Sequence, residues 1–246
     1  AILDICDYIN KNSKNNIIYI HPEKTGIINL DKLAELINPE TYMISIMHVN
    51  NEIGVIQPIK EIGKLCKSKK ILFHVDAAQS YGKLDIDVKE INIDFLSISA
   101  HKIYGPKGIG ALYINRKNKV SSIMYGGSQE KSLRPGTLAV PLIVGFGKAS
   151  KIASIVMKKE SKTILNLRNI LFEQIMSNIN DVHINGCMEN RISGNLNFSF
   201  PQLKGQSIIN SIPRIAVSSG SACTSSSPTS SHVLHSIGLS NKLSNS

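Results

Sequence analysis

Short apolar runs that end in polar residues constrain the fold of this chain more than any other feature of its sequence. Four runs read as buried strands, at residues 42–48, 71–75, 94–99 and 111–114. Between the first two runs, apolar residues recur at helical spacing, namely Ile59, Ile62, Leu65 and Cys66. Short strands that alternate with an amphipathic helix predict an α/β sheet with at least some parallel pairing.

The pattern changes after Thr137. The segments that follow read as two helices at 140–157 and 164–179, a strand at 195–200, a helix at 207–212 and a strand at 215–218. We therefore expect a large domain over residues 1–155, built on the parallel sheet with helices on both faces. A smaller α+β domain is expected over residues 156–246.

Polar side chains with catalytic potential follow the predicted strands, where the sites of parallel sheets gather. They are Asn51, Asp76, Gln79, His101 and Lys102. Lys102 comes directly after a strand and before the glycine-rich turn 104–110. A lysine for a Schiff base and an acid for the pyridine nitrogen are what pyridoxal phosphate enzymes need. Taken alone, Asp76 would more often be the N-cap of a helix that starts at residue 77.

One of the four cysteines lies in a loop of small residues. Cys223 is surrounded by Ser and Gly in the segment 218–225, without apolar periodicity around it. Free cysteines are usually buried like small hydrophobic residues, but a Ser/Gly-rich loop is solvated and suits a thiol that must react. We expect a reactive Cys223. No function is assigned to the other three, Cys6, Cys66 and Cys187, whose wide spacing argues against a structural zinc site.

The composition describes a basic chain of 246 residues with 28 Lys and Arg against 18 Asp and Glu. Because the lysines are scattered, we expect no direct nucleic-acid binding, but attraction to an acidic protein partner or a phosphate cofactor. No apolar run approaches the roughly 20 residues of a membrane span. No signal peptide is visible, so free thiols in a reducing compartment are expected. The first residue is not methionine and a helix is predicted at once, which suggests a fragment.

Four segments together resemble the motifs of one enzyme family, at residues 48–54, 74–80, 99–108 and 218–225. Their order and spacing are those of cysteine desulfurases, members of the class V aminotransferases with the fold of type I pyridoxal phosphate enzymes. The chain is most similar to the housekeeping type that feeds iron–sulfur cluster assembly. One such motif would be weak support, whereas four in series over nearly the whole chain are specific.

The resemblance implies how the strand-end residues hold the ring of pyridoxal phosphate. Lys102 forms the Schiff base and, once released, moves protons as a catalytic amine. Asp76 forms an ion pair with the protonated pyridine nitrogen. Gln79 forms a hydrogen bond with the ring hydroxyl, and Asn51 lies near that oxygen or near the substrate carboxylate.

By the same resemblance, Ser99 and groups around His101 hold the phosphate, and His101 is also a catalytic residue. Thr137 matches a threonine that reaches the phosphate of the neighbouring subunit's cofactor, which implies a homodimer. The motif Arg134-Pro135-Gly136 before it departs from the family's usual Arg-Ser-Gly. Two histidines at the predicted strands are read as structural, His48 and His74.

The activity that the resemblance implies is conversion of L-cysteine to L-alanine, with the sulfur passed to Cys223 as a persulfide. The sulfur acceptor is an iron–sulfur scaffold protein or a tRNA-thiolation relay, and Cys223 serves as a transient iron–sulfur ligand in this interpretation. The bacterial cytoplasm is favoured over the mitochondrial matrix, with no membrane association. Segments beyond both ends of the chain would supply a phosphate loop and a substrate-binding arginine.

Other functions stay open at this point. A selenocysteine lyase or an aminotransferase of the same fold would keep Lys102 and Asp76, although an aminotransferase has no need for the thiol of Cys223. A non-catalytic scaffold subunit of the same fold would have no physical reason to keep all three residues.

Overall fold

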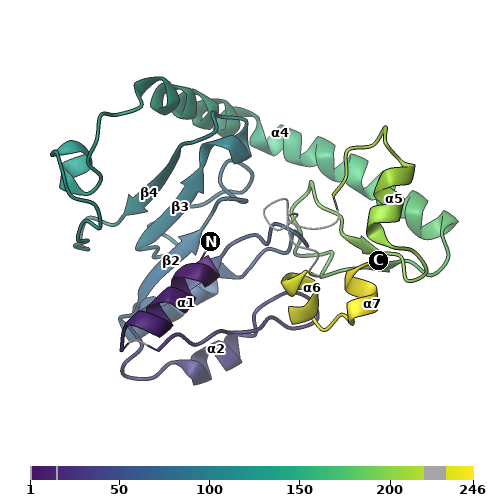
Figure 1. Ribbon diagram of the computed structural model, residues 1–246, viewed down its shortest axis with the longest axis horizontal. Helices are drawn as coiled ribbons and strands as arrows, with labels where there is room; N and C mark the ends of the chain where they lie inside the picture. The colour runs from purple at the N-terminus through teal and green to yellow at the C-terminus, as the bar shows by residue number, and fades with distance from the viewer. Residues whose placement is uncertain (1, 15, 219–230) are drawn as a thin grey trace.

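The computed structural model describes residues 2–14, 16–218 and 231–246 (Figure 1). The strands are β1 (Met43–Met47), β2 (Leu72–Asp76), β3 (Phe95–Ser99), β4 (Gly110–Ile114), β5 (His183–Ile184) and β6 (Phe198–Ser199). The α-helices are α1 (Ile2–Asn12), α2 (Leu30–Leu36), α3 (Ile59–Lys69), α4 (Val140–Asn178), α5 (Gly205–Ser211), α6 (His232–Ser236) and α7 (Asn241–Ser244). Two 3-10 turns complete the described elements, η1 (Ala100–Ile103) and η2 (Gln129–Ser132).

One four-stranded sheet in the order β1-β2-β3-β4 lies in the first part of the chain. β1, β2 and β3 are parallel neighbours, and β4 joins β3 in the antiparallel direction. Parallel neighbours need a crossover connection, which α3 provides between β1 and β2. The predicted α/β fold with a mostly parallel sheet is confirmed, and each of its four predicted strands overlaps an observed one.

Alternate residues of the parallel strands build the main core on one face of the sheet. Phe73 and Val75 of β2 are fully buried there, packed in one cluster with Ile62 and Cys66 of α3. The helical spacing predicted for this segment is therefore confirmed. Gly63 lets α3 approach the chain after β2, because a Cβ atom at this position would lie 1.8 Å from the carbonyl oxygen of Ile91.

α4 is one continuous helix of 39 residues, where the sequence predicted two. The residues between the two predicted helices, 158–163, contain no Gly or Pro that would end a helix. Residue 155 lies inside α4, so a division of the chain at that position remains a proposal. By length and composition alone α4 could cross a membrane, but one such helix is weak support for a membrane span. The first half of α4 packs against η1 through Phe146 and Ala149.

The C-terminal region contains a two-stranded antiparallel sheet, β5 with β6, and the short helices α5, α6 and α7. α5 confirms the helix predicted at 207–212, and β6 lies within the strand predicted at 195–200. The strand predicted at 215–218 is wrong. Its apolar residues Ile215 and Val217 are 60% and 50% exposed, so they lack the packed surface that stabilises a strand.

The C-terminal region is joined to the loop after β1. Ile56 N donates a hydrogen bond to Asn190 O at 2.8 Å. Next to this contact, the buried guanidinium of Arg191 donates to the carbonyl oxygens of residues 185–187. Burial lowers the pKa of Arg191 to about 10, which still leaves it charged at neutral pH. The junction therefore fixes the loop that follows the first strand.

Candidate active site

The carboxyl ends of β2 and β3 meet at one edge of the sheet, with Asp76 opposite Ser97 in register. Asp76 is the last residue of β2 and is half-buried. Its Oδ1 accepts a hydrogen bond from Ala78 N at 2.9 Å, which closes a turn and starts no helix. The alternative role of Asp76 as a helix N-cap is therefore wrong, and its other carboxylate oxygen has no hydrogen-bond partner among the described residues.

Lys102 lies in η1, directly after β3. Its neighbours Ala100 and Ile103 are buried against α4, which fixes the turn, while the side chain of Lys102 is half-buried and that of His101 is exposed. The hydroxyl of Ser99 and Nδ1 of His101 are hydrogen-bonded at 3.0 Å. Within the described part of the chain, Lys102 forms no ion pair. A half-buried amine, a hydroxyl and an imidazole are thus gathered at the carboxyl end of β3.

Asn51 lies in the loop after β1 and is exposed. The side chain of its neighbour Asn50 shapes the loop by accepting hydrogen bonds from the backbone N–H groups of Glu52 (2.9 Å) and Ile53 (3.1 Å). The carbonyl oxygen of Glu52 accepts from the Asn195 side chain at 2.9 Å. The loop that carries Asn51 is therefore held by its own asparagine and by the C-terminal region.

The remaining predicted site residues differ in their placement. Gln79 is half-buried in the turn after Asp76, whereas Thr137 is exposed in the segment between η2 and α4. Cys223 lies outside the described residues. Ser231, which follows Cys223 by eight positions, caps α6 and donates a hydrogen bond to Oε2 of Glu52. Ser231, the first described residue after position 218, thus contacts the loop that carries Asn51.

Lys83 is a neighbour of the site that the sequence pattern did not reveal. It lies in the turn after β2, where its backbone N–H donates to Ser80 O at 3.0 Å. Burial, and then the charge of Lys102, lower the pKa of the Lys83 amine. The packing of the turn against η1 brings Lys83 close to the predicted Schiff-base lysine, and no sequence pattern indicates this proximity.

The sequence predicted a structural role for His48 and assigned no function to Cys66. Both are buried, and burial raises the pKa of the Cys66 thiol to about 12 and lowers the pKa of His48 to about 4. At neutral pH the Cys66 thiol is protonated and therefore a poor nucleophile. The His48 imidazole is neutral and has no positive charge with which to bind an anion. In the described ranges, no cluster of three or more His, Cys, Asp or Glu side chains could hold a metal ion.

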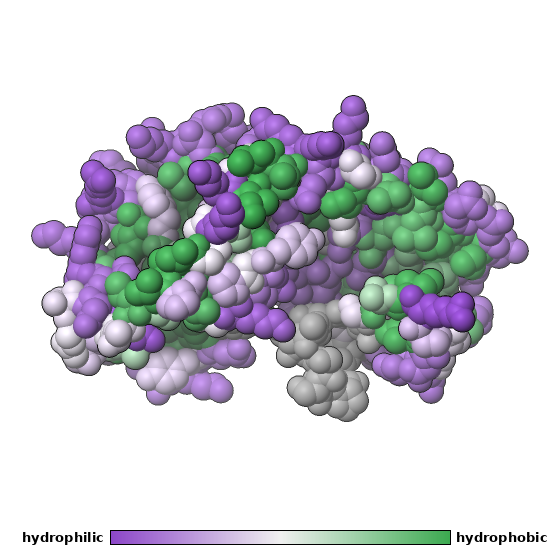
Figure 2. Space-filling model, turned by 90° about the horizontal axis from the view of Figure 1, so that it is seen from above, coloured by the Kyte–Doolittle hydropathy of each residue, from purple (hydrophilic) through white to green (hydrophobic). Residues whose placement is uncertain are grey.

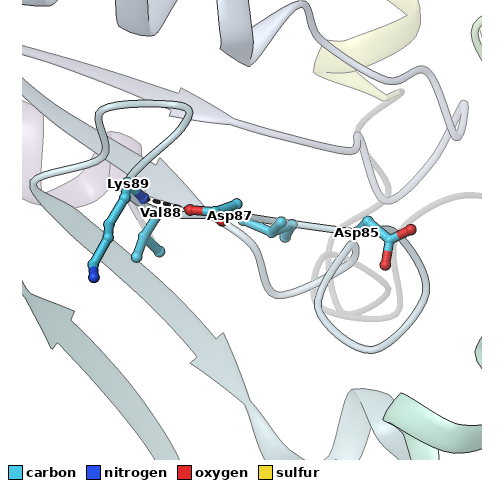
Figure 3. A pocket seen from close by; sticks show the side chains of 5 residues that line it. Asp85, Asp87, Val88 and Lys89 are labelled. Atoms are coloured by element: carbon cyan, nitrogen blue, oxygen red, sulfur yellow. Dashed lines mark hydrogen bonds between the residues drawn. The ribbon is translucent and has the colours of Figure 1, made fainter.

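Two surface hollows lie away from the strand-end residues. The first, of about 480 Å³, is lined by residues 85–89, and Figure 3 shows the Asp87 side chain accepting a hydrogen bond from the Lys89 N–H inside that segment. The second, of about 540 Å³, lies between the first turn of α3 and the same segment. Neither contains a predicted site residue, so the candidate site is identified by its convergent side chains.

The arrangement of the sheet, with a lysine turn after one strand and a carboxylate at the end of its neighbour, is that of type I pyridoxal phosphate enzymes. A structure of a NifS-like protein matches with a TM-score of 0.90 and 31% sequence identity, covering 99% of this chain and 64% of that one. A structure of SspA in complex with cysteine matches with a TM-score of 0.81 and 38% identity, covering 99% and 67%.

The family profile "Aminotransferase class-V" matches residues 1–244, so the chain belongs to the class-V aminotransferase family. It is also 51% identical to the cysteine desulfurase IscS of Buchnera aphidicola subsp. Baizongia pistaciae, over 100% of this chain and 61% of that protein. The chain spans about 60% of the length of the curated relatives it matches.

Pyridoxal phosphate is the cofactor of this family, and the strand-end residues fit it. Lys102 offers an amine without an ion pair among the described residues, and Asp76 has a carboxylate oxygen without a hydrogen bond there. The paired side chains of Ser99 and His101 supply donors suited to a phosphate. Amine, carboxylate and phosphate-binding donors thus lie at two neighbouring strand ends.

Proposed function

We propose that the chain forms the lysine-bearing and cysteine-bearing part of a cysteine desulfurase. The observation that carries the proposal is the meeting of Asp76 with the Ser99–Lys102 turn at adjoining ends of two parallel strands. The sequence relationship to cysteine desulfurases and the fold shared with a cysteine-bound protein support L-cysteine as the substrate. When bound, pyridoxal phosphate supplies an electron sink for an amino acid.

Each site residue then has a defined physical role. Lys102 holds the cofactor covalently through Nζ and, when released, accepts and returns protons at that atom. Asp76 keeps a proton on the ring nitrogen through its negative charge. Gln79 and Asn51 position the ring oxygen and the substrate, whereas Ser99, His101 and Thr137 bind phosphate, Thr137 that of a neighbouring subunit.

Sulfur transfer is the task of Cys223. Its thiolate attacks the sulfur of L-cysteine, so that the carbon–sulfur bond breaks and a sulfur–sulfur bond forms. The carbon skeleton takes a proton and leaves as L-alanine, and the enzyme keeps the sulfur as a persulfide. The contact of Ser231 with Glu52 supports this role, because it ties the chain beyond Cys223 to the Asn51 loop.

Partners of the proposed enzyme are a sulfur acceptor, such as an iron–sulfur scaffold protein, and a second copy of the chain. Apolar residues exposed on α4 support a homodimer, since they need cover; they include Val140, Val144, Ile152, Ile155, Leu167 and Ile170. Figure 2, which views the molecule from the side of α4, shows apolar patches among hydrophilic side chains. The bacterial origin of the relatives supports the cytoplasm as its compartment.

Product analysis tests the proposal. We expect the full-length protein with pyridoxal phosphate to release L-alanine from L-cysteine and to form one persulfide on Cys223, detected by alkylation and mass spectrometry. Lys102→Ala should lose both alanine and the visible absorbance of lysine-bound cofactor. Cys223→Ser should keep that absorbance but lose alanine and persulfide, because a hydroxyl cannot become a persulfide.

Other products would identify a different enzyme or none. Amino-group transfer to a 2-oxo acid without persulfide would indicate an aminotransferase. Turnover of selenocysteine alone would indicate a selenocysteine lyase. Normal alanine release by Lys102→Ala, or a persulfide trapped on Cys6, Cys66 or Cys187 in a fully active Cys223→Ser protein, would contradict the proposed roles.

A further inference from the structure

A hydrogen-bonded bridge crosses the three parallel strands directly below the candidate site. The Ser45 hydroxyl of β1 and Nδ1 of His74 are 2.7 Å apart, and Nε2 of His74 and the Ser97 hydroxyl of β3 are 2.9 Å apart. His74 itself lies in the middle of β2. One imidazole thus uses both of its nitrogens to join the two strands on either side of its own.

These three strands carry the separate parts of the site. β1 leads into the loop with Asn51, β2 ends at Asp76, and β3 leads into the turn with Lys102. His74 and Asp76 lie two residues apart on one face of β2, because side chains alternate along a strand. The bridge therefore lies one step below the carboxylate and touches each strand that delivers a site residue.

The imidazole in this bridge is neutral at physiological pH. Burial lowers the pKa of His74, and the charge of Asp76 offsets this effect only in part. A neutral imidazole has one N–H donor and one lone pair, and a serine hydroxyl can donate or accept. Both contacts are therefore satisfied in either tautomer, without placing a second charge beside Asp76.

We propose that His74 is a positioning residue of the active site, which holds the ends of β1, β2 and β3 in the register that brings Asn51, Asp76 and Lys102 together. This inference rests on the proposed function and adds a residue that the sequence marked only as structural. The main apolar core lies on the opposite face of these strands, so on the site face the bridge adds side-chain hydrogen bonds across all three strands to the backbone ladders that pair them. Misplacement by about 1 Å can cost on the order of 100-fold in rate.

The first test compares substitutions of His74 in the full-length protein. His74→Leu should remain folded by circular dichroism, yet bind pyridoxal phosphate about tenfold or more weakly and release alanine roughly 100-fold more slowly. His74→Gln should recover most of both, because its amide can donate to one serine and accept from the other. His183→Leu is the matched control, since this exposed histidine belongs to the separate two-stranded sheet of β5 and β6, and it should behave as wild type.

The second test needs no cofactor. Hydrogen–deuterium exchange of the apo-protein should become about tenfold faster in His74→Leu in all three peptides that contain Asn51, Asp76 and Lys102. Faster exchange in β2 alone, or unchanged cofactor affinity and rate in His74→Leu, would overturn the positioning role. If the wild type bound no pyridoxal phosphate, the proposed function would fail by itself, while the exchange pattern would still decide whether His74 couples the strand ends.

Discussion

The two faces of the central sheet use alternate residues of the same strands for different purposes. One face is apolar and buried, with Ile46, Phe73 and Val75 packed in the main core beside α3. The other face carries polar side chains, among them Asp76 at the carboxyl end of β2 and the bridge of His74 to its neighbours. Side chains that pack in the core and side chains that face the site thus alternate along each strand.

This separation has a physical consequence. A substitution on the apolar face removes buried contacts and lowers stability, whereas one on the polar face changes charge and geometry at the site. Effects of the two kinds should add independently where the side chains share no contacts. Variants on each face of β2 therefore test whether the strand divides its tasks in this way.

Among variants on the two faces of β2, Asp76→Asn should have the largest effect on catalysis. The amide has no negative charge to keep a proton on the ring nitrogen, and stabilisation of developing charge is usually the largest catalytic contribution. Alanine release should slow by several orders of magnitude, with each tenfold loss corresponding to about 1.4 kcal/mol. Cofactor binding, measured by absorbance, and the urea midpoint should change little. A rate within about threefold of wild type would leave Asp76 with a turn-forming role only.

A position three residues before Asp76, on the opposite face of β2, should give the reverse result. Phe73 is fully buried in the core, and Phe73→Ala should lower the free energy of unfolding by about 3–5 kcal/mol through lost burial and a residual cavity. Urea denaturation measures this change. Below the transition, the absorbance of bound cofactor should match the wild type. Intact stability, or a shifted cofactor band in folded protein, would show that the two faces are coupled.

A smaller effect is expected for a second carboxylate, Asp94, which lies before β3. It accepts hydrogen bonds from Phe73 N at 3.0 Å, Asn118 Nδ2 at 2.9 Å and Lys117 Nζ at 3.1 Å. Burial raises the pKa of Asp94, but these bonds outweigh burial and hold it below its ordinary value of 3.8. Asp94→Asn should cost about 1–3 kcal/mol at pH 7 and leave the chemistry unchanged.

The sign of the pH dependence follows from the lowered pKa of Asp94. The native state prefers the ionised carboxylate, so its contribution to stability is complete above the unfolded value near 3.8. This contribution to stability is lost as the pH falls from about 3.8 through the lower pKa of Asp94 in the native state. Urea midpoints of wild type and Asp94→Asn should therefore converge below pH 4, and a difference that persists at low pH would contradict this origin.

Sequence alone predicted the parts of this protein that depend on local pattern. Alternation and apolar spacing gave the four strands of the sheet and helix α3, because burial on one face imposes these periods. The run of polar residues after each strand indicated where a site would form. The strand predicted at 215–218 failed because apolar residues there have no surface to pack against.

Tertiary structure alone decided which side chains meet across these elements. No spacing in the sequence indicates that His74 contacts both Ser45 and Ser97, that Lys83 lies near Lys102, or that Ser231 reaches Glu52. Such contacts join residues up to 179 positions apart. They depend on strand order and on the packing of turns, which the pattern of a single segment does not contain.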